Sequence, residues 1–146
     1  MGHIDPKYYS GLPPSEAEAQ KSRIRASRAA YRRGRYRRRP TPASYKHRTS
    51  RHVRDFRRIH KLSLADRAGI ARALGVSRAQ QSRILRKGKG AYYSSGSRPG
   101  QTPESWARAR LASALLGRGA CNVDRKILAP TASCAELRRR AVRRPL

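Results

Sequence analysis

Acidic residues are scarce in this chain, and their scarcity limits what the protein can do. Of its 146 residues, 8 are Asp or Glu and 36 are Lys or Arg, so the formal net charge is +28 at pH 7. A folded protein with such an excess of one sign repels itself, and we expect it to work with a polyanion bound. The few carboxylates are not paired for acid–base catalysis, and an enzyme is therefore the least favoured class.

Long apolar runs are missing as well. No stretch approaches the roughly 20 residues that a transmembrane helix needs. The first residues lack the apolar stretch of a signal peptide, and Pro6 stands where the myristoylation pattern needs Ser or Thr. We therefore expect no membrane partner, and a protein that is intracellular or part of a particle.

Cysteine and histidine are too few and too scattered for a metal centre. The two cysteines, Cys121 and Cys134, have no histidine nearby, because all four histidines lie between residues 3 and 60. This spacing matches no zinc motif, and we predict neither a metal nor another cofactor. We interpret the pair as free, partly buried thiols; the alternative is a disulfide, within or between chains, in an oxidised particle.

Arginine is what the chain has in abundance. Residues 32–39 hold six arginines around Gly34, and Tyr31, Tyr36 and Tyr45 flank or interrupt this run. A guanidinium group grips phosphate oxygens bidentately and stacks on bases or on tyrosine rings. We expect the segment to be disordered alone and ordered on nucleic acid, the alternative being a solvated basic tail. The tyrosines have no apolar face to join there, which favours stacking on bases or on guanidinium groups.

Helical patterns dominate the rest of the chain, and no strand-like alternation of any length occurs. Ser15, followed by acids in a first turn, predicts a helix that ends before Gly34. Residues 40–50 are predicted to be a linker. A basic amphipathic helix should follow, with Phe56 and Ile59 docking on the next domain.

Only residues 61–128 contain enough apolar side chains for a core, and this length is near the lower limit for independent folding. We predict a mainly α-helical protein with an N-terminal arm (1–60), a small helical domain (61–128) and a basic C-terminal tail (129–146). We expect the arms to be extended or partly helical, and the small domain to need support from partner subunits or nucleic acid. The expected core residues are Leu62, Leu64, Ile70, Leu74, Val76, Ile84, Leu85, Trp106, Leu111, Leu115, Leu116, Val123, Ile127 and Leu128.

Three helix starts carry capping signals. Ser77 with Gln80 three residues later has the capping-box pattern. Thr102 followed by Pro103 places an N-cap before a proline at the first helical position. Ser133 should open a short C-terminal helix that contains arginines 138–140, 143 and 144.

Residues 67–85 resemble the helix-turn-helix of bacterial regulators. Ala71 takes the small position of the first helix, Gly75 the turn, and Val76 and Ile84 the apolar positions. Gln81 departs from the pattern, which has an aliphatic residue there, and the alternative is a plain helical hairpin. By the resemblance, the residues that face the major groove would be Ser77, Arg78, Gln80, Gln81 and Arg83.

Residues 86–100 are so rich in Gly and Ser that we expect an irregular loop. Lys87 and Lys89 would supply charge, and Tyr92 and Tyr93 would stack on bases, which makes a second contact with nucleic acid or with a subunit. The Gly and Lys spacing is not that of a phosphate-binding Walker A loop. We therefore predict no nucleotide hydrolysis and no small-molecule substrate.

Residues 21–58, with 16 basic residues and one acid, resemble the arginine-rich arms of viral capsid and core proteins. The resemblance implies a structural virion protein that binds and neutralises a packaged DNA or RNA genome beside other subunits of a large assembly. The main alternative is a ribosomal protein, cytoplasmic or organellar, with basic arms threaded through ribosomal RNA. A helix-turn-helix regulator in the nucleoid is the third interpretation.

The residues predicted to contact nucleic acid are Arg32, Arg33, Arg35, Tyr36, Arg37, Arg38, Arg39, Lys46, Arg48, Arg51, Arg54, Arg57, Arg58, Arg78, Arg83, Lys87, Lys89, Tyr92 and Tyr93. They combine cations for phosphate oxygens with rings for bases.

Overall fold

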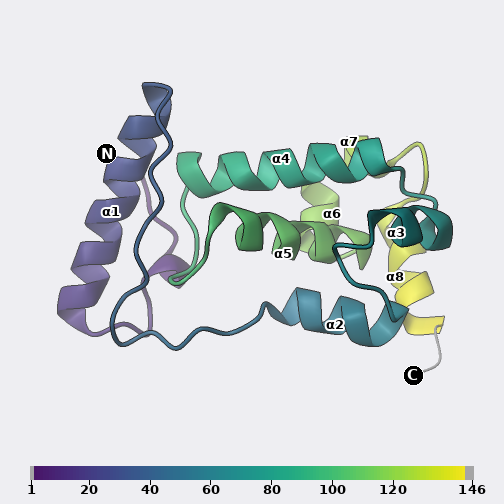
Figure 1. Cartoon of the computed structure of the whole chain (residues 1–146), viewed down its shortest axis with the longest axis horizontal. Coiled ribbons are helices and arrows are strands. Elements are labelled where there is room, and N and C mark those ends of the chain that lie inside the picture. The colour runs from purple at the N-terminus through teal and green to yellow at the C-terminus, as the bar shows by residue number, and fades with distance from the viewer. Residues whose placement is uncertain (1, 144–146) are drawn as a thin grey trace. The chain divides into compact units, whose positions relative to one another are not determined.

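The computed structural model describes residues 2–143, and its regular structure is helical (Figure 1). Within that range there are eight α-helices and no strand, which confirms the prediction of a mainly helical protein. The elements are the 3-10 turn η1 (Pro6–Tyr8) and the helices α1 (Pro14–Arg32), α2 (Arg51–His60), α3 (Arg67–Leu74), α4 (Arg78–Ser94), α5 (Pro103–Leu115), α6 (Gly119–Val123), α7 (Arg125–Leu128) and α8 (Cys134–Arg143).

The chain divides into two compact units, each built from two stretches of sequence. The first unit joins the N-terminal residues up to Arg48 with Lys89–Trp106, and the second joins Thr49–Gly88 with the residues from Ala107 onward. The units do not coincide with the predicted ranges 1–60, 61–128 and 129–146. In particular, α2 and α8 belong to the second unit, and α4 and α5 each contribute to both.

The predicted helix starts are confirmed in three cases. The Ser77 Oγ accepts a hydrogen bond from the Gln80 N–H at 3.1 Å, and the Gln80 Oε1 accepts one from the Ser77 N–H at 2.7 Å. Thr102 and Ser105 exchange the same pair of bonds before α5. The Ser133 Oγ accepts from the third residue on at the start of α8. Arg144, predicted to extend that helix, lies outside the described residues.

Helix α1 begins two residues earlier than predicted, since Ser15 was expected to be its N-cap. Pro13 is its N-cap and Pro14 its first helical residue, so Ser15 is not the cap. A proline at this position has its backbone angle already set for a helix and lacks an N–H that would go unbonded. The end of the helix, before Gly34, is confirmed.

The prediction of an irregular loop over residues 86–100 is wrong for its first half, because α4 continues to Ser94. Gly88 is buried, and a Cβ built on it would lie 2.7 Å from the Ala107 Cα of α5. The glycine therefore allows two helix backbones to pack closely. This contact offsets the roughly 1 kcal/mol that glycine costs in a helix.

The second unit contains a continuous apolar core. Phe56 and Ile59 of α2 are buried in it, as predicted, together with Leu137 of α8, which the sequence did not indicate. Val123 was predicted to be buried but is 68% exposed. Val123 is the last residue of the five-residue helix α6, in which Cys121 is buried. Residues two positions apart in a helix point in nearly opposite directions, so Val123 faces away from the core.

The two cysteines form a disulfide, so the prediction of free thiols is wrong. Cys121 lies in α6 and Cys134 opens α8, and their Cα atoms are 5.8 Å apart. That distance is ordinary for a disulfide. Both residues are buried in the second unit, where the bond links α6 to α8 across 13 positions of sequence.

The first unit has a smaller and more polar interior. The buried face of α1 consists of Gln20, Ile24, Ser27 and Ala30, which recur at helical spacing and are half polar. Trp106, predicted to be a core residue, is half-buried and lies edge-on against Tyr8 with ring centroids 5.9 Å apart. Polar contacts therefore contribute much of the stability of this unit.

Candidate nucleic-acid interface

The arginine-rich segment leaves α1 through a left-handed glycine. Gly34 has a φ of +77°, a conformation that residues with a Cβ rarely adopt, and the Arg35 N–H returns to the Ala30 carbonyl. The chain thereby reverses and runs back along α1 (Figure 1). Ser27 bonds to the Arg37 carbonyl at 3.4 Å near one end of this path, which is part of the first unit.

The other end of the returning segment is also fixed. Ser44 donates through its Oγ and its N–H to the Glu16 Oε1, at 2.8 and 3.2 Å. Tyr45 covers Gly100, where a Cβ would lie 2.4 Å from the ring. Intramolecular contacts thus hold both ends of this segment against α1, and its disorder in the absence of nucleic acid stays a prediction.

Arg39 and Tyr92, predicted to contact nucleic acid, are instead buried against each other. The Arg39 guanidinium lies 3.8 Å from the centroid of the Tyr92 ring. The backbone N–H of Arg39 donates to the Tyr92 hydroxyl at 2.7 Å. The guanidinium also donates to Ser27 Oγ and Ser97 Oγ, both at 2.9 Å, and to the Tyr92 carbonyl at 3.0 Å. Burial lowers the pKa of Arg39. Both residues are therefore corrected from binding residues to parts of the interior of the first unit.

Arg38 is exposed but its charge is already compensated. Its two terminal nitrogens donate to the two carboxylate oxygens of Glu104 at 2.8 and 2.9 Å. This bidentate bond raises the pKa of Arg38 and lowers the pKa of Glu104. Arg38 thus connects the segment to the start of α5 within the first unit.

The tyrosines of this region stack on each other. Tyr31 and Tyr93 are parallel with ring centroids 6.0 Å apart, and Tyr36 lies 5.9 and 5.2 Å from them. Burial raises the pKa of Tyr93. The expectation that Tyr31 and Tyr36 lack an aromatic or apolar face to join is therefore wrong, since Tyr93 on α4 supplies one. Tyr36 remains 68% exposed and offers a ring for stacking at the edge of this cluster.

All eight carboxylates of the chain have intramolecular partners. Two accept hydrogen bonds, Asp66 from the Gly69 N–H and Glu16 from Ser44. The other six pair with Lys or Arg; they are Asp5, Glu18, Asp55, Glu104, Asp124 and Glu136. The protein has no further acid with which to neutralise its remaining cations.

Four arginines beside Tyr36 are left without such compensation. They are exposed, and within residues 2–143 their side chains form no hydrogen bond or ion pair. We call this group the exposed arginine segment; its members are Arg32, Arg33, Arg35, Tyr36 and Arg37. Uncompensated guanidinium groups beside an exposed ring are suited to a ligand that has both phosphates and bases.

The remaining predicted residues lie on both units. Lys46, Arg48 and Lys89 are exposed on the first unit, where Tyr93 is half-buried. The others are exposed on the second unit; they are Arg51, Arg54, Arg57, Arg58, Arg78, Arg83 and Lys87. Of these, Arg51 and Arg58 lie 3.7 and 3.6 Å from Asp55, and Lys87 lies 3.7 Å from Asp124.

Helices α3 and α4 form the helical hairpin that the sequence suggested. Gly75 in the turn has a φ of +73°, and Val76 and Ile84 are fully buried. Gln81, the departure from the regulator pattern, is buried and donates to the Arg67 and Val76 carbonyls, each at 3.0 Å. These bonds explain how a polar residue replaces an aliphatic one in this core.

Gln80, which the resemblance places toward DNA, is held by the protein. Its amide nitrogen donates to the Ile127 carbonyl at 2.9 Å, and its Oε1 accepts from Ser77 and Thr131. Its side chain is therefore occupied by structural contacts. Arg78 and Arg83 are exposed on the same helix.

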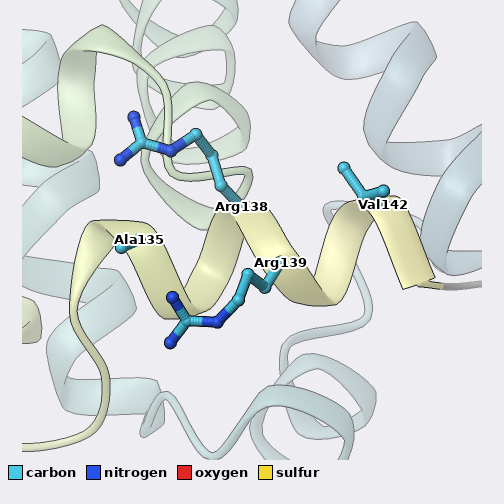
Figure 2. Close-up of a pocket in the computed structure, with 4 residues that line it drawn as sticks. All are labelled: Ala135, Arg138, Arg139 and Val142. Carbon is cyan, nitrogen blue, oxygen red and sulfur yellow. The ribbon is translucent and has the colours of Figure 1, made fainter.

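A shallow hollow of about 390 Å³ lies on the C-terminal helix and is lined by Ala135, Arg138, Arg139 and Val142 (Figure 2). Arg138 and Arg139 extend to different sides of α8, and Arg139 pairs with Glu136 at 2.8 Å (Figure 2). Val142 is 86% exposed. The hollow thus has no convergent polar groups that would select a ligand.

The part of the chain that the structure describes contains neither a candidate metal site nor a membrane-spanning helix. No group of three or more His, Cys, Asp or Glu side chains there is placed to hold a metal ion. No helix among these residues is long and apolar enough to cross a membrane.

Comparison with known proteins gives a family. The chain matches the model of DUF5824, a family of unknown function, over residues 5–128, and it belongs to that family. The match includes most of both compact units and the whole exposed arginine segment, and it ends before α8. No curated protein and no solved structure matches the chain.

Proposed function

We propose that this protein is a non-enzymatic, structural nucleic-acid-binding protein whose principal contact is the exposed arginine segment. The proposal rests on positive charge that the protein itself does not neutralise. Four arginines within six residues have no carboxylate partner, because all eight Asp and Glu side chains bind other groups of the protein. Phosphates of a nucleic acid supply the missing negative charge. Binding releases the counterions of those phosphates, which favours association at low salt.

The chemistry supports binding without a strong sequence preference. Guanidinium forks contact phosphate oxygens, which are the same in every nucleotide. Tyr36, exposed at the edge of the cluster with Tyr31 and Tyr93, provides a ring on which any base can stack. Lys46, Arg48 and Lys89 are exposed on the same unit and extend the cationic surface.

For the setting, we propose a virus particle in which the protein binds and neutralises the packaged genome beside other subunits. The excess of cations on both units, and not on one tail alone, supports a condensing role. A ribosomal protein is the alternative. Sequencing the nucleic acid that co-purifies with the native protein at low salt separates the two: genomic nucleic acid from end to end supports the particle, and ribosomal RNA supports the ribosome.

A regulator is the second candidate function, favoured by the helical hairpin of α3 and α4. Arg78 and Arg83 are the exposed residues of α4 that would read a major groove. Under our proposal, changing both to Gln leaves the relative affinities for different duplex sequences unchanged. Loss of one preferred sequence would instead support the regulator.

The direct test replaces Arg32, Arg33, Arg35 and Arg37 by Gln. The variant leaves out Arg38 and Arg39, because their side chains contact Glu104 and Tyr92 and their loss would disturb the fold. Affinities for several unrelated single-stranded and double-stranded sequences are measured at a fixed salt concentration. We expect all of them to fall by a similar factor, because the lost contacts are to phosphates. Unchanged affinity would contradict the proposal.

A further inference from the structure

A hollow of about 260 Å³ in the first unit lies between α1 and the chain that returns along it. It is lined by Arg23 and Ala26 of α1 and by residues 37–40, so four of its six lining residues are arginines. No carboxylate is among them. Arg23 was not predicted to bind anything, because nothing in the sequence shows that it lies near Arg37.

One lining residue has a buried donor that needs an acceptor. Arg39 is 9% exposed, and its Nε–H has no hydrogen-bond partner within the described residues although its terminal nitrogens are bonded. A buried donor without an acceptor destabilises the folded protein. The Nε has almost no accessible surface, so an oxygen atom bound in the hollow reaches it once the Arg39 side chain shifts toward the hollow.

The charges around the hollow define the ligand. Glu104 compensates Arg38, but the side chains of Arg23 and Arg37 form no hydrogen bond or ion pair within residues 2–143. Two uncompensated guanidinium groups beside an unsatisfied Arg39 donor suit a group with several anionic oxygens. We infer that this hollow is a binding site for one phosphate group; we call it the phosphate pocket.

This inference deepens the proposed function, since the phosphate would belong to the bound nucleic acid, but phosphate binding is measured separately. The full-length protein is freed of nucleic acid by nuclease and high salt, and inorganic phosphate is titrated at low ionic strength by calorimetry. One variant, Arg23→Gln with Arg37→Gln, removes two lining cations. The matched control, Arg32→Gln with Arg33→Gln, removes the same charge outside the pocket. Circular dichroism checks that both variants fold.

We expect saturable phosphate binding that weakens at least about tenfold in the pocket variant, because each charge-assisted hydrogen bond contributes about 1.5 kcal/mol or more. The control should change by less than about twofold. Equal weakening in the two variants, or no saturable binding by the native protein, overturns the inference.

The source of the phosphate follows from competition with a short oligonucleotide, with and without a 5′-phosphate. Displacement of inorganic phosphate by both forms places an internal phosphodiester in the pocket, and displacement by the phosphorylated form alone places a terminal phosphate there. If the protein binds oligonucleotides but no inorganic phosphate, the phosphate pocket is contradicted and the proposed function is supported. If it binds phosphate but no oligonucleotide, the phosphate pocket is supported and the proposed function is contradicted.

Discussion

The two units of this protein are stabilised by different kinds of contact. The second unit has an apolar core to which seven helices, α2 to α8, contribute side chains, and the disulfide between Cys121 and Cys134 links two of them. The first unit has few fully buried apolar side chains, Ile24 and Tyr92 among them, and relies on Arg39 for many of its internal bonds. A chain with so few apolar and acidic residues thus uses one arginine as a core residue while leaving its neighbours exposed.

The comparison separates stability from binding. In the first unit the exposed arginine segment has no acidic partners, whereas Asp55 in the second unit pairs with Arg118 at 2.8 Å and lies near two further arginines. The hydrogen bond from Arg118 lowers the pKa of Asp55. Changes to buried contacts should therefore affect stability unit by unit, and changes to the uncompensated arginines should affect binding.

The largest expected effect concerns the disulfide of the second unit. Replacing both cysteines by Ala should lower the free energy of unfolding by about 3 kcal/mol, as expected for a closed loop of this size. Hydrogen exchange should show reduced amide protection in α5 and α8 and unchanged protection in α1. Reductant should destabilise the native protein to a similar extent and leave the double variant unchanged; equal stability of native protein and variant would contradict the bond.

The next effect concerns the polar interior of the first unit. Arg39→Met keeps an unbranched stem but removes the donors to Ser27 and Ser97. We expect a loss of about 2 kcal/mol, because buried hydroxyl groups lose a charged partner. Amide exchange in α1 is the measurement, and Arg38→Met is the control. Equal effects of the two substitutions would show that Arg39 is not the residue that holds this unit.

The third comparison concerns two glycines of α4 that lie in different units. Gly88→Ala should destabilise by about 1–3 kcal/mol, because the new Cβ meets the backbone of Ala107. Gly90→Ala should stabilise by up to about 1 kcal/mol, because its Cβ would reach only ordinary contact with Tyr31 at 3.5 Å. Both substitutions change helix propensity alike, so urea denaturation isolates the packing. Two shifts of the same sign would contradict the close approach of the helices.

Local signals in the sequence predicted much of the fold. The capping residues Ser77 and Thr102, the end of α1 before Gly34, and the amphipathic pattern of α2 all depend on neighbours within a few positions. The continuation of α4 to Ser94 was not predictable in the same way. Gly88 weakens a helix locally and is favoured only by its contact with Ala107, a residue 19 positions away.

The site was predictable in composition but not in detail. Six arginines in a short run are chemically identical in sequence, and only the folded chain separates buried Arg39 from exposed Arg37. Tyr93 joining Tyr31, and Arg23 joining the phosphate pocket, likewise depend on contacts between distant segments.

The most direct test of the account is a salt titration of nucleic-acid binding with two variants of equal charge change. One variant replaces Arg32, Arg33, Arg35 and Arg37 by Gln. The other replaces four cations that have acidic partners and were not predicted to bind, namely Lys7, Lys21, Arg139 and Arg140. We expect the slope of log affinity against log salt to flatten by about 3 in the first variant, for four lost phosphate contacts, and by less than about 1 in the second. Equal flattening would show that total charge, and not the exposed arginine segment, binds the nucleic acid.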